Sequence, residues 1–236
     1  MGSINVVYKN ELNLIPMRNF NAIEMDLFFS ICAKMKNKNT DTIRFDFGQL
    51  KELSNYKPTA NKRFIDDLER VYDKMLHLTY CERSGLSFKK FVLFNSYEVN
   101  AEEAYVEVAI NPKLDHILNQ LENEFTKFEL KQFTQIRSSY AKTMYRLLKQ
   151  YRTTGFYKVK IDDFKDLLDI PPSYRMIDID QRVLKPIVKE LTNYFDNLMI
   201  IKKKAKKGNK IAALEFHFKE TNKKPSVPMH NWLEDT

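Results

Sequence analysis

Apolar residues in the first half of the chain recur at helical spacing in some segments and alternate with polar residues in others. Residues 21–37 place Ile23, Leu27, Ile31 and Met35 on one side of a helix. The remaining segments of this half predict a strand at 43–47, a short helix at 47–54, a long helix from the turn at Pro58 to about Leu76, a hairpin of strands at 78–82 and 88–99, and a strand at 105–110.

The second half repeats this order of elements. It predicts a long helix at 129–151, a strand at 156–161, a short helix from Asp162, a second long helix at about 178–195, and strands at 198–203 and 211–218 joined through Gly208-Asn209. The offset between the two halves is roughly 115 residues, and order and spacing repeat better than the residues themselves.

A short helix, a turn, a longer amphipathic helix and a β-hairpin are typical of a winged helix-turn-helix. We therefore predict an α+β protein of two tandem winged helix-turn-helix domains, at residues 1–124 and 125–220, followed by a tail at 221–236. The long helix of such a domain enters a major groove, and the hairpin lies along the flanking backbone. An α+β protein that binds no DNA stays open at this point, because winged helices also serve as protein-interaction modules.

Composition is that of a folded chain. The 236 residues are 43% hydrophobic and 30% charged, with five glycines and eight prolines, which is too apolar for a disordered protein. We expect a cytoplasmic protein, because no run of about 18 apolar residues occurs and Met1–Asn10 lacks the pattern of a signal peptide. Two cysteines are too few for a disulfide framework or a zinc site.

Positive charge is concentrated in the second half. The formal net charge is +8, but residues 1–128 hold 17 basic and 18 acidic side chains, whereas residues 129–236 hold 22 and 13. An excess of nine positive charges in one half favours a partner rich in phosphate. Chance unevenness combined with one lysine-rich loop is the alternative explanation.

Three stretches carry a resemblance to a known family: FTQIRSSYAKTMYRLLKQY at 133–151, NELNLIPM at 10–17, and IDDFKDLLDIPPSYRMIDIDQRVLKPIVK at 161–189. The first resembles the signature helix of the iteron-binding plasmid replication initiators, the initiator replication protein family with its RepA-, RepB- and RepE-like members of theta-replicating plasmids. The resemblance covers about residues 5–218 and is strongest to initiators of low-GC Gram-positive bacteria.

The resemblance implies two winged-helix domains that bind double-stranded DNA repeats, the iterons, at a plasmid origin and start theta replication. It implies a homodimer formed through the first domain. From the charge distribution we expect the second domain to provide the main origin binding and the first domain to make auxiliary DNA contacts. Family members bind iterons as monomers, often repress their own gene as dimers, and act with a host replication initiator and helicase. They are not enzymes.

Base contacts require side chains near the start of the groove helix that can reach base edges. Our candidates are Tyr174, Arg175, Gln181, Arg182 and Lys185, of which Arg175 and Arg182 match basic positions of the family. Asp180 stands where some relatives are basic, and its carboxylate can accept from cytosine or pair with a neighbouring Arg. Pro186 lies inside this helix, so the helix either bends there or begins later.

Phosphate contacts suit ammonium and guanidinium groups on helix starts and wings. The candidates are Lys57, Asn61, Lys62 and Arg63 in the first domain, and in the second Arg137, Lys142, Arg146, Lys149, Lys189, Lys202, Lys203, Lys204, Lys206, Lys207 and Lys210. For each of them an ordinary solvated side chain is the alternative. Asp66, Asp67 and Glu69 follow the first group, so we expect weaker DNA contact from the first domain. We also expect Phe88, Phe91, Phe94 and Tyr97 to supply a dimer interface.

Enzymatic functions fit the sequence poorly. The four histidines are isolated, whereas a rolling-circle nickase needs a metal-binding histidine pair and a catalytic tyrosine. No GxxxxGK[ST] loop is present to bind a nucleotide. We therefore expect no enzymatic activity, no metal and no cofactor. A winged-helix transcriptional regulator and a DNA-nicking replication enzyme remain the competing hypotheses.

Overall fold

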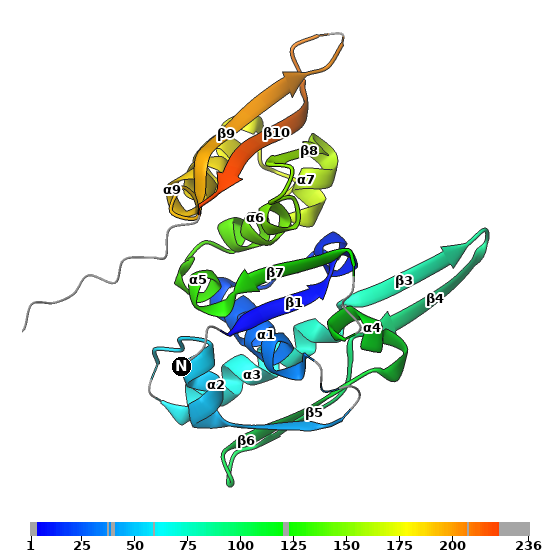
Figure 1. The fold of residues 1–236 in the computed structure, drawn as a ribbon, viewed down its shortest axis with the longest axis vertical. Coiled ribbons are helices and arrows are strands. Elements are labelled where there is room, and N and C mark those ends of the chain that lie inside the picture. Colours follow the sequence, from blue (N-terminus) through cyan, green and yellow to red (C-terminus); the bar gives the residue numbers. More distant parts are fainter. Residues whose placement is uncertain are drawn as a thin grey trace, which may run out of the picture.

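The computed structural model describes residues 4–36, 38, 41–58, 60–119, 123–206 and 208–221, apart from the side chains of residues 81–83 (Figure 1). Lys207 and the tail beyond Thr221 lie outside the described residues. Two winged-helix units are stacked along the long axis of the molecule (Figure 1). The predicted α+β fold of tandem winged helices is confirmed.

Each unit is built around a three-stranded antiparallel sheet in which the last strand lies in the middle. The sheets have the orders β2-β6-β5 and β8-β10-β9, so the repeat anticipated from spacing is a repeat of topology. The helices and strands of the first unit are α1 (Ala22–Met35), β2 (Ile43–Asp46), α2 (Phe47–Leu53), α3 (Asn61–Met75), β5 (Phe94–Asn100) and β6 (Tyr105–Ile110).

The second unit follows the same order with a longer wing. Its elements are α6 (Ser139–Gln150), β8 (Phe156–Lys160), α7 (Ile161–Leu167), α8 (Met176–Ile179), a π turn (Asp180–Leu184), α9 (Lys185–Leu191), β9 (Phe195–Lys204) and β10 (Ile211–Glu220). The helix anticipated at 178–195 is thus a continuous helical segment from Met176 to Leu191. It contains a π turn just before Pro186 and does not start after it.

The predicted boundary between residues 124 and 125 falls directly before a strand that pairs with the first unit. Strand β1 (Asn5–Lys9) pairs antiparallel with β7 (Phe125–Glu129), so the chain returns to the first unit before it enters the second. The first unit also contains three short helical segments: η1 (Asn10–Leu14), η2 (Pro112–Leu114) and α4 (Asp115–Leu118).

The run 88–99 is not one strand. Strand β4 (Ser87–Val92) pairs with β3 (Thr79–Ser84) in a hairpin that projects from the body, while β5 belongs to the main sheet (Figure 1). The aromatic residues expected to form one interface are therefore divided. Phe94 is buried and Tyr97 stacks on Tyr72 with ring centroids 4.6 Å apart, whereas Phe88 is exposed on the hairpin.

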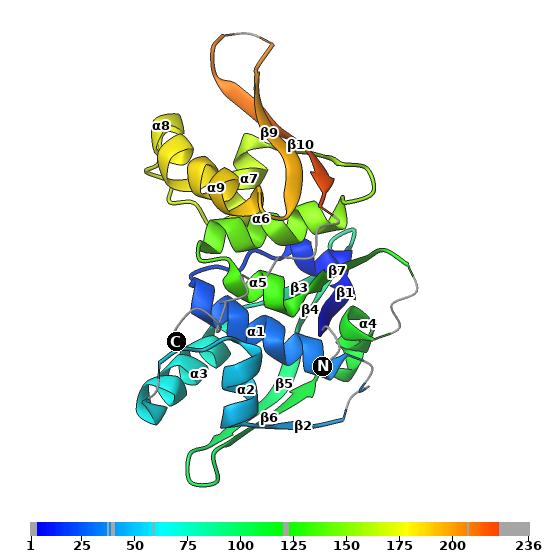
Figure 2. The same cartoon turned by 60° about the vertical axis from the view of Figure 1, so that its left-hand side comes forward.

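The helix expected at 129–151 is interrupted. Helix α5 (Leu130–Gln135) ends before Ile136, and α6 begins after Ser138, whose hydroxyl accepts the amide of Ala141 at 3.3 Å. Ser138 is a favourable N-cap, and this local hydrogen bond competes with continuation of the helix. The interruption turns α6 so that it lies between the two units (Figure 2).

Aromatic residues join the two units into one core. Phe29 of α1, Phe128 of β7, Phe133 of α5 and Tyr145 of α6 contact one another with centroid distances of 5.0 to 6.2 Å. Edge-to-face and offset contacts of buried rings each add about 0.5–1.5 kcal/mol beyond their area. The units are consequently packed against each other and not merely linked.

Candidate nucleic-acid interface

The helix at Met176–Leu191 is called the groove helix below, and its outer face carries the candidate base contacts. Ile179, Val183, Leu184, Ile187 and Leu191 are buried against the second unit, which leaves Gln181, Arg182 and Lys185 exposed. This helix and α3 lie on the same side of the molecule (Figure 2). Two helix-turn-helix helices therefore face one partner surface.

The exposed side chains are held in place by their neighbours. The guanidinium of Arg182 donates to the hydroxyl of Tyr174 at 3.3 Å and lies 5.3 Å from the centroid of its ring. The hydrogen bond to Tyr174 raises the pKa of Arg182. Lys185 donates to the amide oxygen of Gln181 at 2.5 Å, and Arg175 is exposed at the start of the helix. Half-buried Tyr174 thus supports Arg182 in this structure.

Strand alternation divides the wing lysines between two faces. The ammonium of Lys202 lies 2.5 Å from the carboxylate of Asp180, so Lys202 faces the groove helix. Asp180 therefore pairs with a lysine of the wing, whereas the sequence suggested a neighbouring arginine. Lys204 is two residues after Lys202 and therefore lies on the same face of the strand. Its ammonium lies 3.2 Å from the amide oxygen of Asn209. Lys206 and Lys210 are exposed near the tip.

Lys203 points to the opposite face of the sheet. Its ammonium lies 3.1 Å from the carboxylate of Glu215, which Lys158 approaches to 3.0 Å from strand β8. The ammonium groups of Lys158 and Lys203 hold the pKa of Glu215 below its ordinary value. This geometry does not support a phosphate contact by Lys203 alongside the groove helix. The number of lysines in the sequence did not show that they are divided between the two faces of the wing.

Three of the predicted phosphate contacts lie on helix α6, and the structure contradicts them. Lys142, Arg146 and Lys149 are buried, with exposed fractions of 0%, 1% and 6%, because α6 packs against β7 on one side and α9 on the other. A side chain buried in this way cannot reach a phosphate. The prediction that these three side chains contact phosphate is wrong. Apolar residues at helical spacing reveal only one buried face of a helix, whereas α6 is covered by other elements on several faces.

The buried cations of α6 have internal partners. Lys142 donates to the carboxylate of Asp26 at 2.5 Å and to the carbonyl of Phe133 at 2.7 Å, and Lys149 donates to Glu220 at 2.5 Å. Burial raises the pKa of Asp26 to about 7, although Lys142 acts in the opposite direction. Lys142 thereby joins helix α6 to α1.

Arg146 has no acceptor in hydrogen-bond geometry among the described residues. Its guanidinium lies 4.9 Å from the ring centroid of Phe29, and burial lowers its pKa. The Arg146 side chain thus packs against aromatic rings inside the protein, where a phosphate cannot reach it.

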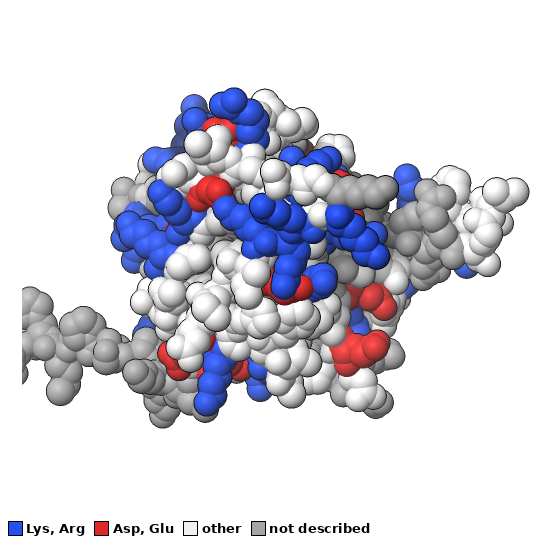
Figure 3. Space-filling view, turned by 90° about the horizontal axis from the view of Figure 1, so that it is seen from above, with Lys and Arg blue, Asp and Glu red and all other residues white. Residues whose placement is uncertain are grey.

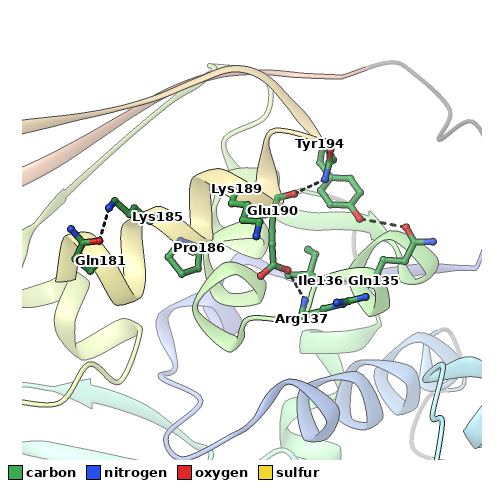
Figure 4. A pocket seen from close by; sticks show the side chains of 10 residues that line it. Gln135, Ile136, Arg137, Gln181, Lys185, Pro186, Lys189, Glu190 and Tyr194 are labelled. Carbon is green, nitrogen blue, oxygen red and sulfur yellow. Dashed lines mark hydrogen bonds between the residues drawn. The ribbon is translucent and has the colours of Figure 1, made fainter. Parts of the chain in front are cut away.

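A hollow of about 620 Å³ lies between the groove helix and the connection from α5 to α6 (Figure 4). Its walls carry Arg137, Lys185 and Lys189, the first and last of which are expected phosphate contacts and are exposed. The carboxylate of Glu190 accepts the amides of Arg137 at 2.6 Å and Ser138 at 3.2 Å. Glu190 therefore anchors the groove helix to the start of α6, a role that its sequence position did not indicate.

The first unit presents a smaller basic surface. Lys57, Asn61, Lys62 and Arg63 are exposed before and at the start of α3, and Asn61 accepts from Lys51 at 2.7 Å. Asp67 is turned inward, where it accepts from Tyr56 and pairs with Arg70.

Seen from above, lysine and arginine side chains gather over the second unit with few carboxylates between them (Figure 3). This distribution suits the phosphate backbone of a duplex, because an extended polyanion is bound by many cations on one face.

The described part of the chain lacks two other kinds of site. None of its helices is both long and apolar enough to cross a membrane. Within the same residues, no three or more His, Cys, Asp and Glu side chains form a group suited to holding a metal ion.

Comparison with known protein families gives two matches that together span most of the chain. The family model described as initiator replication protein, WH1, matches residues 5–149. The model described as initiator Rep protein, WH2, matches residues 160–218. The first match includes β7, in agreement with the strand pairing of β1 and β7, and it extends into α6, the helix that lies between the two units.

Two individual proteins are similar to this chain. The "Probable replication protein rep" of Bifidobacterium longum (strain NCC 2705) is 32% identical over 188 residues, which are 78% of this chain and 63% of that protein. The chain therefore spans less than two thirds of the length of that relative. A crystal structure of the Pi initiator protein in complex with iteron DNA matches with a TM-score of 0.73 and 13% identity, over 94% of this chain and 99% of the other. At this identity the likeness concerns the fold.

Proposed function

Because this chain belongs to the initiator replication protein family, we propose that it binds repeated double-stranded DNA sites in a plasmid origin and starts theta replication there. The observation that carries the proposal is the exposed row of Gln181, Arg182 and Lys185 beside a lysine-rich wing. Gln and Arg form bidentate pairs with adenine and guanine, and wing lysines suit phosphates. The Pi initiator, which shares the fold, was crystallised with iteron DNA.

The second unit provides most of the affinity in this proposal. The residues after 128 carry an excess of nine positive charges, whereas the first 128 carry an excess of one negative charge. Each neutralised phosphate adds about 0.9 to the salt dependence of binding. The first unit adds backbone contacts through the exposed start of α3.

The further partners belong to the same proposal. The chain forms a homodimer through its first unit and in that form represses its own gene. It recruits a host replication initiator and helicase, acts in the cytoplasm on the plasmid, and catalyses no reaction itself. The β3–β4 hairpin favours a protein contact, since Leu86 at its tip and Phe88 are exposed apolar residues that project from the body.

Footprinting of the full chain on the plasmid DNA that surrounds its gene tests the DNA target. We expect protection of several direct repeats in one orientation, with scrambled repeats as the control. Protection of no repeated sequence would contradict the proposal.

A replication assay separates initiation from gene regulation. A plasmid that carries only the origin repeats should be maintained when the gene is supplied in trans, and should be lost without it. Binding that represses a promoter but maintains no plasmid would identify a transcriptional regulator. Nicking of supercoiled DNA by the purified chain with Mg²⁺ would instead identify an enzyme.

A further inference from the structure

The groove helix contains one π turn directly before a proline. Asp180–Leu184 is π-helical, and the amide of Lys185 donates to the carbonyl of Asp180, five residues earlier. The backbone on both sides keeps right-handed helical angles, with φ and ψ of −60° and −43° at Ile179 and −61° and −49° at Lys185. The helix therefore continues through the turn without a break.

Pro186 accounts for the position of the turn. A proline in a helix has no amide to donate to the carbonyl four residues earlier, here that of Arg182, and its ring collides with that carbonyl. A π turn is a single-turn widening that accommodates one extra residue. Widening the helix just before Pro186 allows the chain to pass the proline while remaining helical.

The turn also sets which residues face inward. The buried residues Ile179, Val183, Ile187 and Leu191 are spaced by four. An α-helix turns about 100° per residue, so three such steps would carry the buried face about 120° around the axis. One extra residue in a π turn takes back about 100° of this drift. The four residues can then face one core.

The same geometry aligns the outer row. Gln181, Lys185 and Lys189 have the same spacing, and all three line the hollow at the junction (Figure 4). In a regular α-helix Gln181 would be turned about 80° away from Lys189. With the π turn, Gln181 and Lys189 lie within about 20° of each other around the helix axis.

The two halves of the helix are positioned by different contacts. The C-terminal half is fixed to α6 through Glu190, whose carboxylate accepts two backbone amides. The hydroxyl of Tyr194, just after the helix, donates to the carbonyl of Gln132 at 3.2 Å. The N-terminal half, with Gln181 and Arg182, is oriented relative to this anchor by the π turn.

We propose that Pro186 is a positioning residue for sequence recognition: by holding the π turn, it sets the angle at which Gln181 and Arg182 meet base edges while Lys189 and Arg137 meet the backbone. This inference rests on the proposed function, because it concerns the same DNA surface. Pro186 contacts no base in this scheme. Its effect is on which bases are preferred and not on the number of phosphates bound.

The test compares the full chain with Pro186→Ala, which restores an amide at this position. Pro172→Ala is the matched control, since Pro172 is exposed and precedes the helix. Binding is measured on origin repeats, on scrambled duplex and on a library of randomised duplexes from which preferred sequences are selected. Thermal unfolding of each variant verifies that the chain is folded.

Pro186→Ala should reduce the ratio of specific to scrambled binding by about fivefold to a hundredfold, the range of one lost bidentate base contact. It should shift the selected base at one or two positions and leave the salt dependence unchanged. Pro172→Ala should match the wild type.

An unchanged selected sequence and ratio in folded Pro186→Ala would overturn the role of Pro186 alone. Equal weakening on all duplexes, with reduced salt dependence, would also overturn it, because that result reports lost phosphate contacts. A wild-type chain without any preference for the repeats would instead overturn the proposed function and this inference with it.

Discussion

Adjacent lysines on strand β9 should contribute unequally to DNA binding. Lys204 lies in the row of Lys202, which faces the groove helix through Asp180, whereas Lys203 points to the other face and pairs with Glu215. Lys204→Ala should therefore remove one phosphate contact, and Lys203→Ala should remove none. The two substitutions change net charge equally, so they are matched controls for each other.

The magnitude follows from counterion release. One lost phosphate contact reduces the magnitude of the slope of log binding constant against log salt by about 0.9. Lowering the salt from about 1 M to about 0.1 M then strengthens binding about eightfold less than it does in the wild type. Three exposed wing lysines have no carboxylate partner among the described residues, namely Lys204, Lys206 and Lys210. Together they account for a slope of about 2.7, or about fortyfold between 50 and 200 mM salt.

Fluorescence anisotropy titrations of scrambled duplex at four or more salt concentrations measure these slopes. We expect Lys204→Ala to lower the slope by about 0.9 and Lys203→Ala to leave it at the wild-type value. Equal slopes for the two variants, both reduced, would refute the assignment of faces by strand alternation. A reduced slope for Lys203→Ala alone would reverse it.

Three further predictions concern other parts of the molecule. Arg182→Ala should weaken binding to origin repeats by about 1–3 kcal/mol and binding to scrambled duplex much less, as measured by competition titration; equal losses would make Arg182 a backbone contact. Gly155→Ala should destabilise the chain by at least about 1–2 kcal/mol in urea unfolding, because Gly155 has φ +64° and an added Cβ would lie 2.5 Å from the carbonyl oxygen of Phe218; an unchanged midpoint would contradict the backbone geometry. In the wild type, the free energy of unfolding should fall as the pH rises from about 4 to 7, because folded Asp26 keeps a proton that the unfolded chain releases above the ordinary pKa of 3.8. Asp26→Asn should remove this fall, as measured by urea unfolding across that pH range. A fall that persists in the variant would show that another group causes it.

Local patterns predicted the elements of both winged-helix units well, because helices and strands that cover one core leave a period in the sequence. The ribbon of β1 and β7 was missed for a physical reason. Its strands are about 120 residues apart, and each is only five residues long. Such short segments acquire their structure from a distant partner and not from local preference.

The site was predicted less completely than the fold. Exposed Gln181, Arg182 and Lys185 follow from an amphipathic pattern, since a residue opposite the apolar stripe faces solvent. The burial of Lys142 and Arg146 has no such signal, because charged residues are rarely buried and a single chain segment does not reveal a second covering element. Only the tertiary structure shows that α6 is enclosed.

The enclosed helix α6 links α3 and the groove helix, the two helices that we propose contact DNA. Lys142 joins α6 to Asp26 of α1, and the amide of Arg137, just before α6, is bound by Glu190 of the groove helix. Helix α3 also packs against α1, so the contacts run from α3 through α1 and α6 to α9. Since packed elements move as discrete units, the separation between the two helices is set by buried contacts and not by a linker. A chain of this kind is suited to a DNA site whose two contacted segments have one fixed spacing. A substitution that breaks the Lys142–Asp26 ion pair should therefore alter which spacings between the two contacted DNA segments are bound. It should affect the bases preferred by Gln181 and Arg182 less.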